Sequence, residues 1–250
     1  MKGKVYLVGA GPGDYKLITL KGLEAIREAD VIVYDRLINE ELLKEAKKNC
    51  EMVYVGKKSN QHTMKQEDIN TLLVKEAREG KIVTRLKGGD PYVFGRGGEE
   101  GIVLYSNNIE FEVVPGITSS IGGLCYAGIP ITHRDHASSF HVFTGHLKND
   151  DEELEWDSMV KLNGTLVFLM GMSNLEKIVS RLIEYGKDPN TPVAIINWAT
   201  TPNQYTITER LDQIYQLAQE KNIKPPSLIV IGDVVKCREQ LNFFENKTLS

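Results

Sequence analysis

Short β-branched runs alternate with helical patterns through the first half of the chain, and this alternation constrains the fold more than any other feature. Residues 20–29 illustrate the helical pattern, because Leu20, Leu23 and Ile26 share one face. Strands that alternate with helices predict a parallel sheet covered on both faces. The expected strands are residues 5–8, 31–34, 52–55, 82–86 and 111–114, and the expected helices are residues 20–29, 40–48, 66–79 and 98–106.

The pattern changes after TSSIGGLCYAGIP, a segment that predicts a helix with Thr118 or Ser119 as N-cap and with Gly128 and Pro130 as stop signals. Strand patterns then recur at residues 139–144, 165–170, 193–197, 204–208 and 228–231, with helical patterns at 175–185 and 209–221. A short TTP turn without a helix joins the third and fourth of these strands, which predicts a mixed sheet.

These patterns predict two α/β domains, residues 1–135 with a parallel sheet and residues 136–250 with a mixed sheet, divided near residues 133–137. In such proteins the ligand lies where loops at the carboxyl ends of strands meet the other domain. We therefore expect an active-site cleft between the domains. The acidic stretch NDDEELEWD, residues 149–157, is typical of a solvated surface loop.

Charge and hydropathy exclude several classes of partner. The net charge is −4, without a basic tail, so nucleic acid is not an expected partner. No apolar run approaches the roughly 18 residues that span a bilayer, and the N-terminus does not resemble a signal peptide. These features predict a cytoplasmic protein without a membrane partner.

Cysteine and histidine spacing does not predict a disulfide framework or a metal site. Cys50, Cys125 and Cys237 are odd in number and far apart, which is typical of reduced thiols. The stretch HRDH, residues 133–136, lacks third and fourth ligands at suitable spacing. We expect no metal, and we expect these histidines to make hydrogen bonds or to contact an anion.

The first glycine motif, VGAGPGD at residues 8–14, only partly matches a dinucleotide fingerprint. The third glycine of G-x-G-x-x-G falls on Asp14, and Pro12 removes an N–H that a phosphate would use. Asp35 lies about where the ribose-binding acid of that fingerprint is expected, so the motif alone leaves a nicotinamide-dependent oxidoreductase as an alternative.

The second glycine motif, RLKGGDPYVFGRGGEE at residues 85–100, places a carboxylate where phosphate-binding loops have bare N–H groups. Gly88 and Gly89 allow close approach of the backbone to a ligand, and Pro91 restricts Asp90 to extended angles. An oriented acceptor suits a ligand with hydroxyls, amines or positive charge. The alternative is a tight turn in which Asp90 caps its own backbone.

Ionisable residues follow several expected strands. Asp35 comes directly after VIVY, and Lys57 comes after MVYV, so both open on one edge of the same sheet. Arginine suits the bidentate binding of carboxylates. Basic or imidazole side chains concentrate near strand ends or loops assigned to the first domain, namely Arg36, Lys57, Lys58, Arg85, Lys87, Arg96, His133 and Arg134.

Taken together, these motifs resemble the tetrapyrrole methylase family over about residues 4–244, nearly the whole chain. The resemblance is carried by VYLVGAGPGD, VIVYDRL, YVGKK, RLKGGDPYVFGRGGEE, VVPGITSSIGGLCYAGIPITHRD, TGHLK, LVFLMG and KPPSLIVIGDVV, which occur in the family's order and spacing. The combination is far more specific than any single motif.

The resemblance implies a homodimeric two-domain enzyme that binds S-adenosylmethionine in the cleft between its domains. It also implies that the enzyme methylates uroporphyrinogen III twice, through precorrin-1, to give precorrin-2 and S-adenosylhomocysteine on the way to sirohaem and cobalamin. The N-terminal domain would hold substrate and part of the cofactor, and the C-terminal domain would complete the cofactor site. S-adenosylmethionine has no phosphate, so a carboxylate among glycines is compatible with it.

The family's site residues transfer to this sequence motif by motif. Asp35 resembles the proton acceptor, Lys57 the proton donor, and Arg85 an arginine near the substrate. The implied cofactor contacts are Pro12, Gly88, Gly89, Asp90, Val93, Thr118, Ser119, Met170 and Ala199. One departure concerns Ala199, in NWATTP, because family members commonly have glycine there; an alanine still offers backbone contacts to the adenine.

The resemblance leaves two further alternatives. A methylase for a later cobalamin precursor would share the cofactor loops, and a tetrapyrrole carrier would bind the porphyrinogen without turning it over. For the methylase we expect direct attack of an electron-rich pyrrole β-carbon on the sulfonium methyl, with acceleration from positioning and exclusion of water. The sequence also predicts a monofunctional chain.

Overall fold

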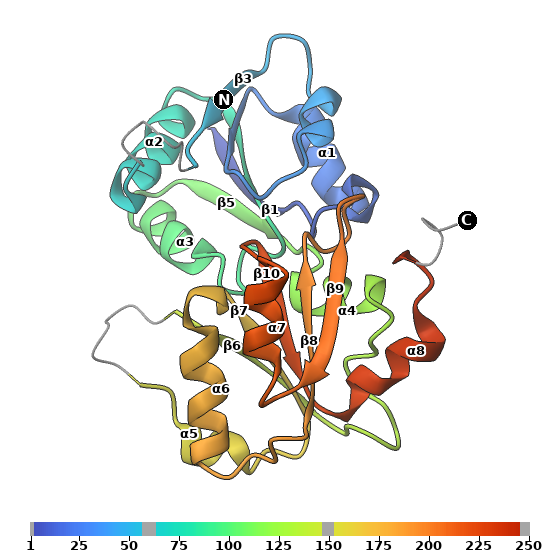
Figure 1. Cartoon of the computed structure of the whole chain (residues 1–250). Helices are drawn as coiled ribbons and strands as arrows, with labels where there is room; N and C mark the ends of the chain where they lie inside the picture. The colour runs from blue at the N-terminus through green and yellow to red at the C-terminus, as the bar shows by residue number, and fades with distance from the viewer. Residues whose placement is uncertain (1–2, 57–63, 147–152, 246–250) are drawn as a thin grey trace. The chain divides into compact units, whose positions relative to one another are not determined.

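A computed structural model describes residues 3–56, 64–146 and 153–245. The chain divides into two compact units, Met1–Thr118 and Ser119–Ser250, each built around its own sheet. Figure 1 shows the elements of each unit. Both sheets agree with the prediction: the first is parallel, and the second is mixed.

The first unit contains a five-stranded parallel sheet in the order β3-β2-β4-β1-β5. β-branched and other apolar residues dominate its central strands, as expected for a sheet that is buried on both faces. The strand bounds are β1 Lys4–Gly9, β2 Val31–Tyr34, β3 Glu51–Tyr54, β4 Ile82–Lys87 and β5 Glu110–Val114. All five run in one direction, so their carboxyl ends lie along one edge.

Helices cover both faces of this first sheet (Figure 1). On one face, α2 (Gln66–Arg78) and α3 (Gly97–Ser106) pack Leu73 and Leu104 against Val5, Val33 and Val83. On the other face lie α1 (Leu20–Glu28) and the 3-10 helix η2 (Glu40–Glu45). A second 3-10 helix, η1 (Tyr15–Leu17), precedes α1, whose N-cap Thr19 accepts a hydrogen bond from Gly22.

The second unit contains a five-stranded sheet in the order β6-β7-β10-β8-β9. β6 and β7 are parallel, and the other neighbouring pairs are antiparallel, as the TTP turn between β8 and β9 predicts. The strand bounds are β6 Phe140–Thr144, β7 Thr165–Leu169, β8 Pro192–Asn197, β9 Tyr205–Arg210 and β10 Ser227–Ile231.

Apolar clusters fill both faces of this second sheet. The larger cluster lies under α5 (Trp156–Val160), α6 (Leu175–Glu184) and α7 (Ile214–Glu220), which share one side of the sheet in Figure 1. The other cluster lies under α4 (Ser119–Tyr126) and η4 (Asp233–Cys237). The short elements η3 (Met172–Asn174) and α8 (Arg238–Leu241) complete the unit.

The structure differs from the sequence patterns in four places. Residues 40–48 form only the 3-10 turn η2, and α7 begins at Ile214 because β9 continues to Arg210 in its ladder with β8.

Trp156 near the end of the acidic stretch is buried, so this part is anchored to the core. Residues 149–152 lie outside the described residues. The compact units divide at Thr118, upstream of residues 133–137, because Leu124, Ala127 and Ile129 pack with the second sheet.

Within the described residues, no helix is long and apolar enough to cross a membrane.

Candidate functional site

The carboxyl ends of the parallel strands bring most of the predicted residues of the first unit to one edge. Gly9 at the end of β1 is opposite Lys87 at the end of β4, and Tyr34 at the end of β2 is opposite Leu86. The loop after β1 carries Pro12, and the loop after β4 carries the second glycine motif. Asp35 directly follows β2, and Thr118 follows β5.

Two of these loops are joined by their backbones. Gly11 and Gly89 form an isolated antiparallel bridge, with Gly89 N donating to Gly11 O at 2.8 Å and Gly11 N donating to Gly89 O at 3.2 Å. Both glycines have positive φ, 80° and 69°, a region that L side chains rarely adopt. The bridge places Pro12 beside the loop that contains Gly88 and Asp90.

Close backbone packing explains further glycines at this edge. A Cβ added to Gly116 would lie 2.7 Å from the Cα of Gly9, and one added to Gly9 would lie 2.5 Å from the N of Gly116. A Cβ on Gly88 would lie 2.8 Å from the Cβ of Leu37. These positions therefore require glycine because neighbouring segments of the protein lie too close for a Cβ, independently of any ligand.

Asp90 ties the second glycine motif to the loop after β5. Its Oδ1 accepts a hydrogen bond from Tyr92 N at 2.8 Å, and its Oδ2 accepts one from Gly116 N at 3.0 Å. The capped turn that the sequence left as an alternative is thus present. A carboxylate has about four lone-pair sites, so two bonds leave capacity for a ligand. Val93 lies half-buried in the same loop, before α3.

Asp35 and Arg85 lie together, above a buried cluster of charges. Asp35 Oδ1 accepts from Leu37 N at 3.0 Å, and Arg85 Nη2 lies 3.4 Å from Asp35 Oδ2. Arg85 also donates through Nε to Glu100 Oε1 at 3.1 Å and through Nη1 to the carbonyls of Val33 and Leu86. The Arg85 side chain is 4% exposed and that of Asp35 is 28% exposed, so Asp35 is the accessible member of the pair.

Glu100 is the centre of this cluster. Its side chain is fully buried on α3, and its Oε1 accepts from Arg85, from Lys87 Nζ at 2.9 Å and from Gln66 Nε2 at 3.2 Å. Among the described residues its Oε2 has no hydrogen-bond partner. Burial lowers the pKa of Lys87, and the nearby Arg85 lowers it further, while Glu100 raises it.

The structure describes only some of the predicted basic residues, and these have different surroundings. Lys87 is 4% exposed and bonded to Glu100, and Arg96 forms a surface ion pair with Glu99 at 2.7 Å. His133 and Arg134 belong to the second unit, not the first, in a turn closed by His133 and Ala137. Lys57 and Lys58 lie outside the described residues, so the predicted role of Lys57 stays a prediction.

In the second unit, Met170 and Ala199 follow strand ends at one edge of the sheet. Leu169 on β7 and Ile196 on β8 both pair with Leu228 on β10, so the two strands end at the same level on either side of β10. Ala199 also faces the helix that begins at Ser119, since a Cβ on Gly123 would lie 3.0 Å from the Cβ of Ala199.

Left-handed backbone conformations concentrate at these predicted positions. Among the described non-glycine residues, positive φ occurs at Met170 and on both sides of Ala199, and also at Phe94 and Arg96, one and three residues after Val93. The remaining cases are Asn108 and Asn222, and asparagine tolerates this region well. Bulky or β-branched residues such as Trp198 (47°) and Thr200 (64°) are strained there, and such strain clusters at functional sites.

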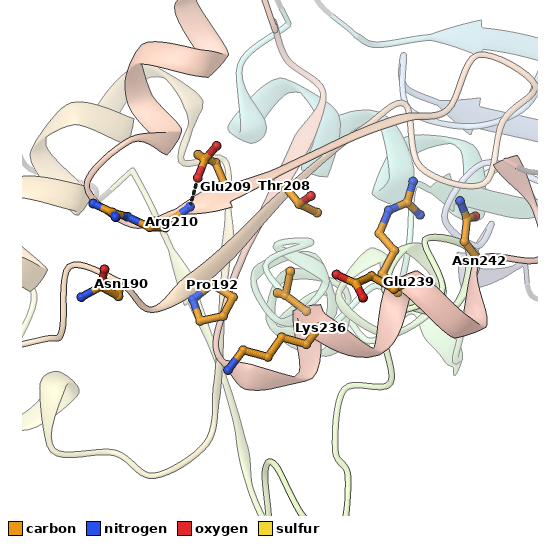
Figure 2. Close-up of a pocket in the computed structure, with 10 residues that line it drawn as sticks. Asn190, Pro192, Thr208, Glu209, Arg210, Lys236, Glu239 and Asn242 are labelled. Carbon is orange, nitrogen blue, oxygen red and sulfur yellow. Dashed lines mark hydrogen bonds between the residues drawn. The ribbon is translucent and has the colours of Figure 1, made fainter.

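A separate cavity of about 450 Å³ lies on the second unit beside Asn190, Pro192 and Asn242 (Figure 2). None of the predicted site residues that the structure describes lines it. Its cations are already held in ion pairs, namely Arg210 with Asp212 at 2.5 Å, Lys236 with Asp233 at 2.7 Å and Arg238 with Glu245 at 2.5 Å. We therefore do not assign the reaction to this cavity.

In the part of the chain that the structure describes, no group of three or more His, Cys, Asp or Glu side chains could hold a metal ion.

Sequence reasoning missed Glu100, because a glutamate in a glycine-rich segment with acidic neighbours is usually solvated. One signal could have found it. Glu100 lies three residues after Gly97 and four before Leu104, on the buried face of α3.

Comparisons with known proteins agree with this geometry. The model of the tetrapyrrole (corrin/porphyrin) methylases matches residues 4–215. Uroporphyrinogen-III C-methyltransferases from Methanocaldococcus jannaschii and Priestia megaterium are 56% and 54% identical, over 94% and 93% of this chain and 98% of each relative. The crystal structure of uroporphyrin-III C-methyltransferase from Thermus thermophilus complexed with S-adenosylhomocysteine matches with a TM-score of 0.80 and 39% identity, covering 94% of both chains.

The parallel and mixed sheets, with the motif residues at their strand ends, are those of a two-domain α/β methyltransferase. The chain belongs to the tetrapyrrole methylase family.

Proposed function

We propose that this protein is an S-adenosylmethionine-dependent C-methyltransferase that methylates uroporphyrinogen III twice, through precorrin-1, to precorrin-2. The observation that carries the proposal is identity above one half, over more than nine tenths of both chains, with relatives named for this activity. The placement of Asp35, Asp90, Met170 and Ala199 at strand ends supports it. The product would serve sirohaem and cobalamin biosynthesis.

The reaction needs a nucleophilic ring carbon, a methyl donor and a proton acceptor. A pyrrole β-carbon forms a bond to the methyl carbon while the methyl–sulfur bond breaks. The electron pair of the broken bond stays on sulfur and gives S-adenosylhomocysteine. The methylated macrocycle is then cationic and must lose a proton. Asp35 is the proposed acceptor, because its carboxylate is partly exposed and held by Leu37 N and Arg85. Lys57 is the proposed proton donor.

The structure supports a more specific role for Arg85 than contact with substrate. Most of its N–H groups already donate to Glu100, to backbone carbonyls and to Asp35. We therefore assign it as a positioning residue for Asp35. The proposed cofactor contacts are Pro12, Gly88, Gly89, Asp90, Val93 and Thr118 from the first unit, and Ser119, Met170 and Ala199 from the second.

We further propose a cytoplasmic homodimer, in which the N-terminal domain holds substrate and part of the cofactor and the C-terminal domain completes the cofactor site. The resemblance to the tetrapyrrole methylase family supports the dimer. Sedimentation of the purified protein tests the dimer, since a monomer at micromolar concentration would contradict it.

One assay tests the reaction: incubation of uroporphyrinogen III with methyl-labelled S-adenosylmethionine. The expected products are S-adenosylhomocysteine and a macrocycle that carries two labelled methyl groups. Inertness toward uroporphyrinogen III with turnover of a later precursor would favour the other tetrapyrrole methylases. Binding of porphyrinogen without any S-adenosylhomocysteine would favour a carrier, and binding of NADH would favour an oxidoreductase.

Two sets of variants test the residue roles. Asp35→Ala and Lys57→Ala should each slow formation of precorrin-2, and wild-type turnover in both would refute the acid–base assignment. Asp90→Ala should weaken cofactor binding by over tenfold, about 1.4 kcal/mol. Asp90→Asn is the matched variant, because it keeps an acceptor for the loop while it removes the charge. Unchanged calorimetric affinity in Asp90→Ala would refute a cofactor role for Asp90.

A further inference from the structure

The loop between β8 and β9 holds a conformation that its own sequence does not favour. Trp198 and Thr200 are both left-handed, and neither is a residue type that tolerates this region well. Local hydrogen bonds account for part of the turn, such as Thr201 N to Trp198 O at 3.2 Å and Gln204 N to Thr201 O at 2.9 Å. Strained residues persist only where the surroundings hold them in place.

Gln204 supplies one such restraint. Its Oε1 accepts a hydrogen bond from Thr200 N at 2.6 Å, and Thr200 is 2% exposed. A trans peptide directs its C=O away from its N–H. Gln204 therefore fixes the direction of the Ala199 carbonyl, because that carbonyl belongs to the same peptide unit as Thr200 N.

Gln204 is in turn held by Glu245 near the end of the chain. Gln204 Nε2 donates to Glu245 Oε1 at 2.8 Å and to the Tyr126 carbonyl at 3.1 Å. Glu245 Oε1 also accepts from Thr206 Oγ1 at 2.6 Å, and its Oε2 pairs with Arg238 Nη2 at 2.5 Å. The Glu245 side chain is 16% exposed, so it forms part of a largely buried polar network.

The segment that carries Glu245 also packs against the end of α4. Arg238 Nη1 donates to the Ala127 carbonyl at 2.5 Å, and the rings of Phe243 and Phe244 lie 5.8 and 4.8 Å from that of Tyr126. The same helix faces Ala199 through Gly123. The last described residues thus contact both elements that surround Ala199.

We propose that Glu245 is a positioning residue for the cofactor, which acts through Gln204 to fix the Ala199–Thr200 peptide and so sets the affinity of the second unit for S-adenosylhomocysteine. The inference rests on the proposed function, because it takes Ala199 as a cofactor contact. The cofactor affinity of this enzyme then depends on a side chain that does not touch the cofactor.

The test is calorimetric titration of the full-length protein with S-adenosylhomocysteine. Glu245→Ala should raise the Kd about tenfold, and Gln204→Ala should do the same. Because Glu245 acts through Gln204, the double variant should bind no more weakly than Gln204→Ala alone. Glu245→Gln keeps an acceptor for Gln204 and should recover most of the affinity. The matched control is Glu239→Ala on α8, an exposed position drawn in Figure 2, which should bind as the wild type does.

Fluorescence gives a second readout that does not need the ligand. The chain has two tryptophans, of which Trp156 is 4% exposed and Trp198 is 44% exposed, so acrylamide quenching mainly reports on Trp198 in the loop. Glu245→Ala should change the quenching constant while Glu239→Ala should not. A shift in thermal midpoint alone, with unchanged Kd and quenching, would mean a purely structural role and would overturn the inference.

The two proposals fail in different ways. A wild-type protein that does not bind S-adenosylhomocysteine would refute the proposed function and, with it, the cofactor role of Glu245. A wild type that binds normally, together with Glu245→Ala and Gln204→Ala variants whose Kd stays within about twofold, would refute the inference and leave the proposed function intact.

Discussion

Substitution of Glu100 by leucine tests whether the buried charge cluster stabilises the first unit as the structure indicates. Glu100 is fully buried, and it is in contact with Arg85 and Lys87, each 4% exposed. With Asp35 the cluster contains two positive and two negative side chains. Glu100→Leu removes one negative charge, so that among the described residues the two neighbouring buried cations keep only the Asp35 carboxylate of this cluster.

The expected cost of this change is large. Removing one partner of a buried ion pair typically costs about 3–5 kcal/mol. At about 2–4 °C per kcal/mol for a chain of this size, the thermal midpoint should fall by about 6 to 20 °C. The neighbouring variant Glu99→Leu is the control, because Glu99 and Arg96 form a pair on the surface, where such pairs are worth about 1 kcal/mol or less.

A second substitution that restores the charge balance tests this reasoning more directly than the loss of stability in Glu100→Leu does. Adding Lys87→Met to Glu100→Leu removes the uncompensated cation, so urea unfolding should show the double variant to be more stable than Glu100→Leu alone, with a coupling energy of about 1–3 kcal/mol. The destabilisation should also depend on pH. The pKa of Lys87 is already lowered in the fold, and loss of Glu100 lowers it further.

The direction of that pH dependence follows from proton binding. Between the lowered pKa of folded Lys87 and its unfolded value of 10.5, the unfolded state binds more protons, so stability rises with pH in this window. Glu100→Leu should therefore recover stability as the solution becomes alkaline. A Glu100→Leu protein within about 0.5 kcal/mol of wild type, or a double variant no more stable than the single one, would refute the reasoning.

Two further predictions concern packing and acid stability. Gly116→Ala places a Cβ 2.7 Å from the Cα of Gly9, where only backbone can move, and should lower the free energy of unfolding in urea by roughly 1–3 kcal/mol. The control is Gly98→Ala, which should cost nothing because no atom lies within 4 Å of the added Cβ. Equal urea midpoints for the two variants would contradict the packing account. The hydrogen bond from Lys81 lowers the pKa of Glu76 below 4.5. The stability that ionised Glu76 contributes to the fold is therefore complete above pH 4.5 and is lost as the pH falls further. Glu76→Gln should thus show a shallower loss of thermal stability between about pH 5 and 2, while Glu67→Gln on the exposed side of α2 should keep the wild-type slope.

Much of the fold could be predicted from the sequence because local patterns and tertiary packing agree. The parallel order of the first sheet follows from strands that alternate with helices, and the antiparallel β8–β9 pair follows from the TTP turn. The failures occur where pairing overrides local preference. Residues 209–210 read as helix, but their ladder with β8 keeps them extended, and α7 starts only at Ile214.

The candidate site could likewise be predicted from the sequence only in part. Placing Asp35 at the carboxyl end of a strand needed only the run VIVY and the direction of a parallel sheet. The sequence listed Arg85 and Lys87 among basic residues near strand ends, but it did not reveal their common partner Glu100, which lies on another element. Nothing in the local sequence pairs these residues, since contact between a strand and a helix depends on how the two pack.

The sequence by itself determined the family, the strand-and-helix order and the residues at the strand ends, because these depend on spacing along the chain. Only the tertiary structure determined which side chains form ion pairs or hydrogen bonds with one another. Glu100 accepts from Arg85 and Glu245 accepts from Gln204, and both glutamates are distant in sequence from these partners. Burial determines such partners, because a charged or polar group removed from water must find its hydrogen bonds wherever the fold brings them.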